Sequence, residues 1–141
     1  MKKQFIPFYL CLKFRELGFD EPCFTYYFTD GVLSDAIEDT EEAIYPGDGK
    51  FLESVNSDNL GISALLYQQA FDFLREKRNL HIEFEFIDQI LGYKFILTNV
   101  KTNTVLSEPS TCYKEFTDVQ IASLDRVIEI IKEQNLKPKQ P

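Results

Sequence analysis

The sequence is poor in the residues that most enzyme active sites use. Among 141 residues there are one histidine, one methionine, three cysteines and no tryptophan. Because His81 is the only histidine, any Ser-His-Asp or Cys-His catalytic device would have to use it. The glycine-rich dinucleotide fingerprint, the Walker A sequence and the motifs HExxH and GxSxG are also absent. The sequence therefore carries no signature of the common hydrolases or nucleotide-binding enzymes, and we expect no cofactor.

Cysteine pairs and long apolar runs are missing as well. Cys11, Cys23 and Cys112 form no CxxC pair, and an odd number of thiols fits a reducing compartment. The apolar run 5–12 resembles a short secretory leader, but charged residues interrupt it and no cleavage site follows. No stretch approaches the roughly 18–20 apolar residues needed to span a bilayer. We therefore expect a cytoplasmic protein that makes no contact with a membrane.

Acidic residues outnumber basic ones and are concentrated in one stretch. The chain has 15 Lys and Arg against 23 Asp and Glu, for a net charge of −8. Residues 21–60 hold ten of the acidic side chains and only Lys50 as a cation. Such a surface repels phosphates, so nucleic acid is not an expected partner, whereas clustered carboxylates attract a basic protein. The candidate partner-binding residues are Asp35, Glu38, Asp39, Glu41 and Glu42.

Two other interpretations of the acidic stretch 35–42 stay open. The stretch is also typical of an ordinary solvated loop, in which the carboxylates have no partner at all. A divalent-cation loop is the third interpretation, although the alternating ligands and the closing glutamate of an EF-hand are missing.

Apolar periodicity and end signals predict helices in the first half of the chain. Pro7 suits a first helical turn and Gly18 suits the position after a last turn, which predicts a helix over 7–17. A second apolar stripe predicts a helix over 64–78, with Ser63 as its N-cap.

A third helix is expected near the C-terminus. A capping box that begins at Thr117 predicts a helix over 118–134, with one apolar stripe facing the core. The tail 135–141 holds two prolines and two lysines, and we expect it to fray into solvent. We find no linker, so residues 1–134 are expected to form a single domain.

Between the helices, alternating and β-branched patterns predict strands. A strand at 23–29 pairs in this interpretation with one at 50–55, giving a strand or hairpin over 23–55. Three further short strands form a meander over 81–106. The predicted fold class is therefore α+β, with an antiparallel sheet of about four to five strands covered by the three helices.

The most site-like cluster lies on the expected strand that begins at 81. The period of two places His81, Glu83 and Glu85 on one face, where they offer three potential metal ligands. Their spacing of about 6.5–7 Å is too wide for one ion without help from another element. The alternative interpretation is the solvated face of a half-buried strand, with Lys94 paired across the sheet.

Four segments carry a resemblance to known proteins: Phe5-Ile6-Pro7, Glu16-Leu17-Gly18-Phe19-Asp20-Glu21-Pro22-Cys23, Tyr67-Gln68-Gln69-Ala70-Phe71 and Leu74-Arg75-Glu76-Lys77. They resemble a group of small uncharacterised proteins that phages and integrated mobile elements of gut anaerobic bacteria encode. The resemblance covers about half of the chain and includes the closing amphipathic helix. It implies an accessory protein that binds a host or phage macromolecule; the group has no assigned activity, so no catalytic residue is implied.

The functional hypothesis from sequence is a non-enzymatic interaction protein that binds a macromolecular partner through the acidic region 30–49 or through an exposed part of its aromatic surface. One alternative is a small metal-dependent hydrolase or nuclease-like enzyme that uses His81, Glu83 and Glu85. The other is a structural subunit of a larger assembly. The oligomeric state and the partner's identity do not follow from the sequence.

Overall fold

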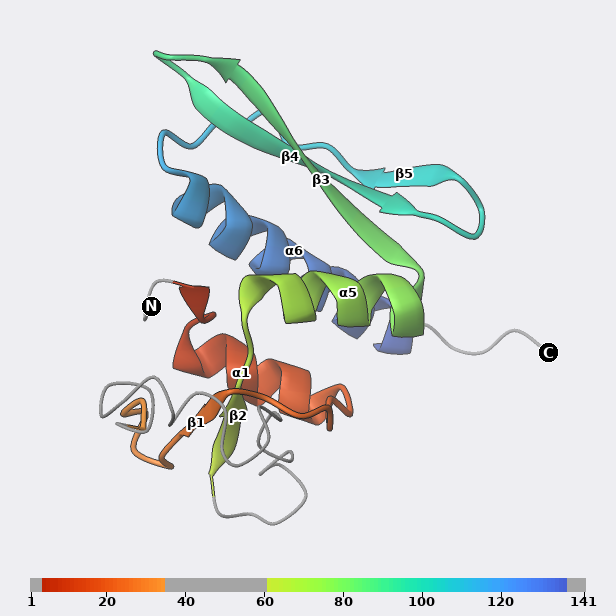
Figure 1. The fold of residues 1–141 in the computed structure, drawn as a ribbon. Helices are drawn as coiled ribbons and strands as arrows, with labels where there is room; N and C mark the ends of the chain where they lie inside the picture. The colour runs from red at the N-terminus through yellow and green to blue at the C-terminus, as the bar shows by residue number, and fades with distance from the viewer. Residues whose placement is uncertain (1–3, 35–60, 137–141) are drawn as a thin grey trace, which may run out of the picture. The chain divides into compact units, whose positions relative to one another are not determined.

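The computed structural model describes residues 4–34 and 61–136 (Figure 1). This part of the chain contains three helices and two antiparallel sheets, which confirms the α+β fold class. The chain divides into two compact units, residues 1–70 and 71–141, and the boundary falls inside the second helix of the described residues.

The first unit begins with helix α1, Phe8–Glu16. Pro7 precedes it as the N-cap, and Gly18 follows its end with a φ of +93°, as expected for a residue just past a helix. The helix buries Leu10, Cys11 and Phe14. The predicted helix over 7–17 is thus confirmed within one residue at each end.

A two-stranded sheet packs beside α1 in this unit. Strand β1, Thr25–Tyr27, pairs antiparallel with β2, Ile62–Ala64. The buried hydroxyl of Tyr27 donates a hydrogen bond of 2.9 Å to the carbonyl oxygen of Ile6, which fixes the sheet against the start of the chain. The expected partner strand 50–55 lies outside the described residues.

The predicted second helix is present, but it begins three residues later than the expected residue 64, and Ser63 does not cap it. Ser63 is fully buried in β2, and helix α5 covers Tyr67–Arg78. The cap is instead provided by Gln69, whose side-chain oxygen accepts a hydrogen bond of 3.0 Å from the backbone N–H of Leu66. The extended pairing with β1 determines the conformation here, because local capping preference is weaker than a buried ladder of backbone hydrogen bonds.

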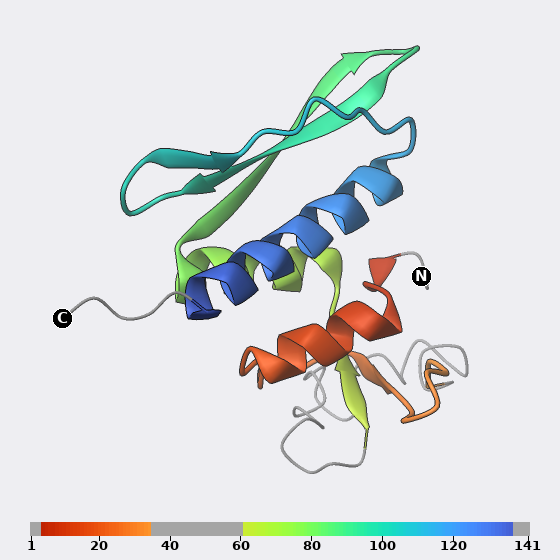
Figure 2. The ribbon, with the colours of Figure 1, turned by 180° about the vertical axis from the view of Figure 1, so that it is seen from behind.

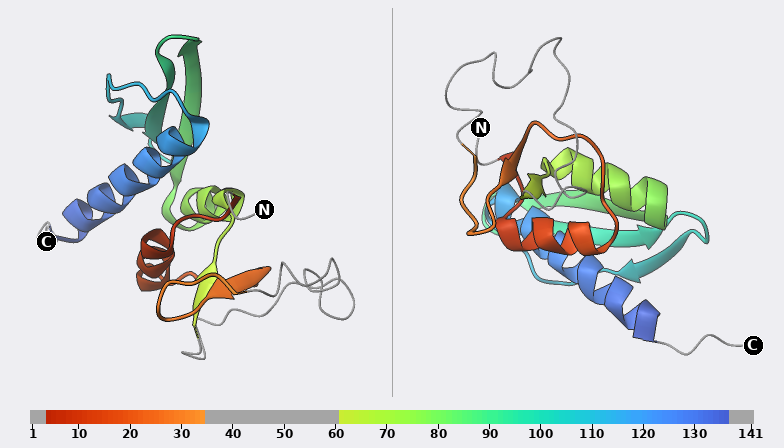
Figure 3. Two further views of the ribbon diagram at one scale, coloured as in Figure 1. Left: turned by 90° about the vertical axis from the view of Figure 1, so that its left-hand side faces the viewer. Right: turned by 90° about the horizontal axis from the view of Figure 1, so that it is seen from below.

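The second unit contains a three-stranded antiparallel sheet in the order β3-β4-β5. Its strands are β3, Leu80–Asp88, β4, Gly92–Asn99, and β5, Thr104–Ser107, which confirms the predicted meander. Helix α6, Phe116–Leu136, runs along one face of this sheet (Figures 2 and 3). We call the face toward α6 the inner face and the opposite one the outer face.

Alternation along the strands determines which side chains reach the core of this unit. Ile82 on β3 and both Phe95 and Leu97 on β4 are buried on the inner face. On α6 the buried stripe extends over nearly the whole helix, because its apolar residues recur at helical spacing. Its members are Val119, Leu124, Val127, Ile128, Ile130 and Ile131.

Two expectations about the size of elements need correction. The described strands do not join into one sheet of four to five strands: α5 separates β2 from β3 along the chain, and the two sheets belong to different units. Helix α6 begins before Asp118 and continues to Leu136. Residues 135–136, expected in the frayed tail, are therefore helical, while 137–141 lie outside the described residues.

Candidate functional site

The acidic residues proposed to bind a partner are not among those that the structure describes. Of the acidic region 30–49, only residues 30–34 are described. Asp30 accepts a hydrogen bond of 3.0 Å from the backbone N–H of Val32 and so stabilises the turn after β1. The five predicted contact residues lie in the remainder: Asp35, Glu38, Asp39, Glu41 and Glu42.

The trio predicted on the first strand of the meander lies on the outer face of β3, as the alternation requires. The antiparallel register places His81 opposite Thr98, Glu83 opposite Ile96, and Glu85 opposite Lys94. Glu83 and Glu85 are exposed, and His81 is half-buried. The three side chains therefore lie in a row along one strand, with mainly uncharged neighbours on β4.

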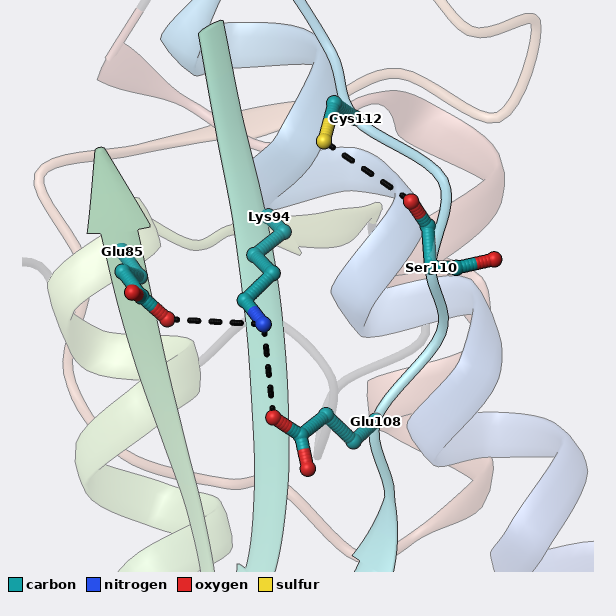
Figure 4. A network of polar contacts seen from close by, with 5 residues as sticks. All are labelled: Glu85, Lys94, Glu108, Ser110 and Cys112. Carbon is teal, nitrogen blue, oxygen red and sulfur yellow. Dashed lines mark hydrogen bonds and ion pairs between the residues drawn. The ribbon is translucent and has the colours of Figure 1, made fainter. Parts of the chain in front are cut away.

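Lys94 forms the centre of a small ion network on this face (Figure 4). Its Nζ lies 3.5 Å from a carboxylate oxygen of Glu85 and 3.4 Å from one of Glu108. The hydrogen bond with Glu108, followed by the charge of Glu85, raises the pKa of Lys94 above its usual value. Exposed ion pairs of this kind contribute little to stability. The main effect of the network is that Lys94 neutralises the charge of Glu85. Glu83 has no cation beside it among the described residues.

The described residues do not assemble a metal centre. Within residues 4–34 and 61–136, no group of three or more His, Cys, Asp or Glu side chains is arranged to hold a metal ion. Glu85 is engaged by Lys94, and the positions opposite His81 and Glu83 on β4 carry no metal ligand. The hypothesis of a metal-dependent enzyme gains no support from this geometry.

The cysteines are placed as structural residues. Burial raises the pKa of Cys11 and that of Cys23 from 9.0 to about 12, so both thiols stay protonated and poorly nucleophilic at neutral pH. The thiol of Cys112 lies 3.7 Å from the carbonyl oxygen of Ser110, to which it donates a weak hydrogen bond (Figure 4). None of these contacts resembles a nucleophile beside a general base.

The most unusual surface of the second unit is apolar and surrounds the β3–β4 turn. The relative exposure is 77% for Ile90, 56% for Phe86 and 49% for Leu91. Large apolar side chains gathered in one place on a protein surface usually mark a binding site. We call this surface the hairpin end; it consists of Phe86, Ile87, Ile90, Leu91 and Phe116.

Aromatic contacts connect the hairpin end to the interior of the unit. The ring of Phe86 lies 5.3 Å from that of Tyr93, and the ring of Tyr93 lies 5.2 Å from that of Phe116. Phe116 in turn contacts Phe84 at 5.3 Å, and Phe84 contacts Phe71 of α5 at 5.5 Å. This row of rings holds the exposed Phe86 and Phe116 in defined positions, so the surface is preorganised.

The turn that displays Ile90 and Leu91 is also fixed. A carboxylate oxygen of Asp88 accepts hydrogen bonds from the backbone N–H groups of Ile90, at 2.8 Å, and Leu91, at 2.6 Å. Gly92 follows with a φ of +85°, and a Cβ there would overlap the backbone of Tyr113. A rigid turn lowers the entropy that a partner must remove on binding.

The hairpin end was not located from the sequence, although the sequence contains a signal for it. Alternation of apolar and polar residues along β3 breaks at Phe86-Ile87, and a second apolar pair, Ile90-Leu91, follows after the two residues Asp88-Gln89. Two apolar pairs that flank a turn cannot both face the core of a half-buried hairpin. Such a break in alternation therefore indicates exposed apolar side chains.

Among the described residues, no helix is both long and apolar enough to cross a bilayer. No family model, no curated protein and no solved structure matches the chain.

Proposed function

We propose that this chain is a non-enzymatic accessory protein whose role is to bind a macromolecular partner, and that the hairpin end is its contact surface. The observation that carries the proposal is the exposure of Phe86, Ile90 and Leu91 on a turn that Asp88 holds rigid. A solvent-exposed turn has no folding reason to carry these side chains, because exposed apolar surface contributes nothing to the core.

The energetics of the hairpin end suit a binding role. Each large apolar side chain that a partner buries contributes about 1.5–3 kcal/mol. The exposed rings of Phe86 and Phe116 belong to the residue class that concentrates binding energy at interfaces, and they are already held in place. Two or three such anchors are enough for a specific contact.

Charge supports a basic partner. The chain carries a net charge of −8, and the acidic stretch 35–42 concentrates that charge. A basic partner would be attracted over a distance comparable to the Debye length and then bound by apolar contacts. The resemblance to proteins of phages and mobile elements supports the same accessory role in the cytoplasm.

A double substitution at the turn tests the proposal. The partner is captured with the native chain, identified by mass spectrometry and purified, and its dissociation constant is measured by calorimetry. The double variant Ile90→Ser with Leu91→Ser lacks two exposed apolar side chains. We expect it to bind the partner about 100-fold more weakly, a loss of about 3 kcal/mol in the free energy of binding. The melting temperature should stay within a few degrees of the wild type, because both side chains are exposed.

Val105→Ser is the matched control, since Val105 on β5 is 55% exposed and lies outside the hairpin end. It should leave the dissociation constant within about twofold of the wild type. Unchanged binding by the double variant, or an equal loss with Val105→Ser, contradicts the assignment of this surface.

A further inference from the structure

Strand β3 is the long edge of the sheet in the second unit. Among the described residues it pairs only with β4, whereas β4 pairs with β3 on one side and with β5 on the other. Tyr93 of β4 also exchanges two backbone hydrogen bonds of 2.7 Å with Tyr113, on the side of β4 away from β3. The nine residues of β3 thus have one edge to which no described strand is bound.

The register shows which backbone groups face that edge. Because Tyr93 directs both its N–H and its C=O toward Tyr113, its pairing with Phe86 on β3 is of the non-hydrogen-bonded kind. Bonded and non-bonded pairs alternate along an antiparallel ladder. The N–H and C=O groups of Phe86, Phe84 and Ile82 therefore point away from β4, and none of them bonds to another described residue.

The side chains beside these groups differ between the two faces. On the outer face, Glu83 and Glu85 are exposed. Glu85 has Lys94 as a neighbour, whereas Glu83 lies opposite the uncharged Ile96. On the inner face, Phe84 is half-buried and Phe86 is 56% exposed. An added strand would thus meet carboxylates on one face and aromatic rings on the other.

This pattern disfavours a second copy of the chain at the edge. Two β3 strands that pair antiparallel around Phe84 place Glu83 of each copy opposite Glu85 of the other. In the next register on one side, Glu83 of one copy lies opposite Glu83 of the other. In the next register on the other side, Glu85 of one copy lies opposite Glu85 of the other. Like charges directly opposite each other destabilise a sheet, and edge charges are a common protection against self-pairing.

We propose that the edge of β3 binds an extended segment of the partner in which basic and apolar side chains alternate. Its backbone adds a fourth strand through the free groups of Phe84 and Phe86. A lysine or arginine side chain of the segment pairs with Glu83, which has no cation beside it among the described residues, and its apolar side chains pack on the two phenylalanines. This inference rests on the proposed function, because the segment belongs to the same partner that contacts the hairpin end.

A short peptide tests the inference without the partner. The probe is an acetylated and amidated peptide of seven alternating lysine and valine residues, titrated into the full chain and followed by amide chemical shifts. We expect saturable binding, with the largest shifts at Phe84 and Phe86. Glu83→Lys should weaken binding at least about tenfold, since it replaces an attraction by a repulsion.

Glu115→Lys is the matched control. It makes the same change of charge at an exposed glutamate in the segment between Tyr113 and α6, on the other side of β4 from the free edge. It should change the affinity less than about twofold. Circular dichroism shows whether each variant is folded.

Two control peptides separate strand addition from simple charge attraction. A peptide of the same composition with its lysines in one block, and the alternating peptide with N-methylated valines, should both bind at least about tenfold more weakly. The edge site is overturned if either control peptide binds as tightly as the unmodified alternating peptide. It is also overturned if Glu83→Lys and Glu115→Lys weaken binding equally.

The outcome is distinguishable from a failure of the proposed function. If the alternating peptide does not bind while Ile90→Ser with Leu91→Ser still abolishes partner binding, only the edge site is wrong. If the peptide binds at the edge while that double variant retains full affinity for the partner, the hairpin end is wrong and the edge site stands.

Discussion

Raising the pH from about 8 to about 11 is expected to lower the free energy of unfolding by about 5 kcal/mol, because the thiols of Cys11 and Cys23 lose their protons more readily in the unfolded chain. Burial raises the pKa of Cys11 and of Cys23 from 9.0 to about 12 in the folded chain. The unfolded chain therefore loses these protons first as the pH rises. The stability that they provide is complete below pH 9 and is lost progressively up to about pH 12.

The size of this effect follows from the two pKa values. As the pH rises from about 8 to about 11, the loss of stability through each thiol is about 2–3 kcal/mol, because the upper pH lies about two units above the pKa of the unfolded thiol. A loss of about 5 kcal/mol approaches the whole stability of many domains. Tyr27, whose pKa burial raises to about 12, acts in the same direction above pH 10.

Urea unfolding at both pH values measures this loss. A variant with Cys11→Ala and Cys23→Ala should lose most of the pH dependence, even if the substitutions lower stability at both pH values. Cys112→Ala removes a thiol that is only half-buried, and it should leave the dependence unchanged. An equally steep alkaline loss in the double variant would mean that the two thiols are not desolvated as described.

Gly92→Ala is expected to destabilise the second unit by about 3 kcal/mol or more. The φ of +85° at this position already disfavours any residue with a Cβ. The added Cβ would also overlap the carbonyl oxygen of Tyr113 and lie 2.7 Å from the Cα of Lys114. Both neighbours are backbone atoms in a segment that the two hydrogen bonds between Tyr93 and Tyr113 hold in place, so neither can move cheaply.

Gly18→Ala separates the two causes of this effect. Gly18 has a φ of +93°, but a Cβ there meets no atom within 4 Å. This variant should lose only about 1 kcal/mol, the cost of the backbone conformation alone. The unfolding free energies of the two variants, measured in urea, therefore differ by the cost of the overlap. Equal losses would show that the chain after β5 does not pack against the start of β4.

Local patterns predicted the second unit well. The alternation from His81 to Phe86 and the apolar stripe of the last helix are properties of neighbouring residues, and both appear in β3 and α6. The capping signal at Thr117 misplaced the start of that helix, because α6 already begins at Phe116. Ser63 failed as a helix cap because its conformation depends on pairing with Tyr26, 37 positions earlier in the chain. Pairing over such a separation leaves no periodic trace in the sequence. The division into two sheets was missed for the same reason.

The candidate site was predicted only in part. The outer face of β3 and its contact with Lys94 follow from a period of two, and the structure confirms both. The edge position of that strand among the described strands could not be predicted, because the pattern along a strand determines its two faces and not its position in a sheet. The position of the Phe86 ring was also not predictable, because it depends on the row of ring contacts described above. That row joins residues from β3, β4, α5 and α6, which lie far apart in the sequence.

Amide hydrogen exchange along β3 tests most directly whether this edge is free to bind a partner. In the free chain the amides of Glu83 and Glu85 face β4 and should exchange about 100-fold more slowly than those of Phe84 and Phe86. On adding the partner, the amides of Phe84 and Phe86 should become protected. Equal protection of all four amides in the free chain would show that another segment already covers the edge, and would contradict its role in binding.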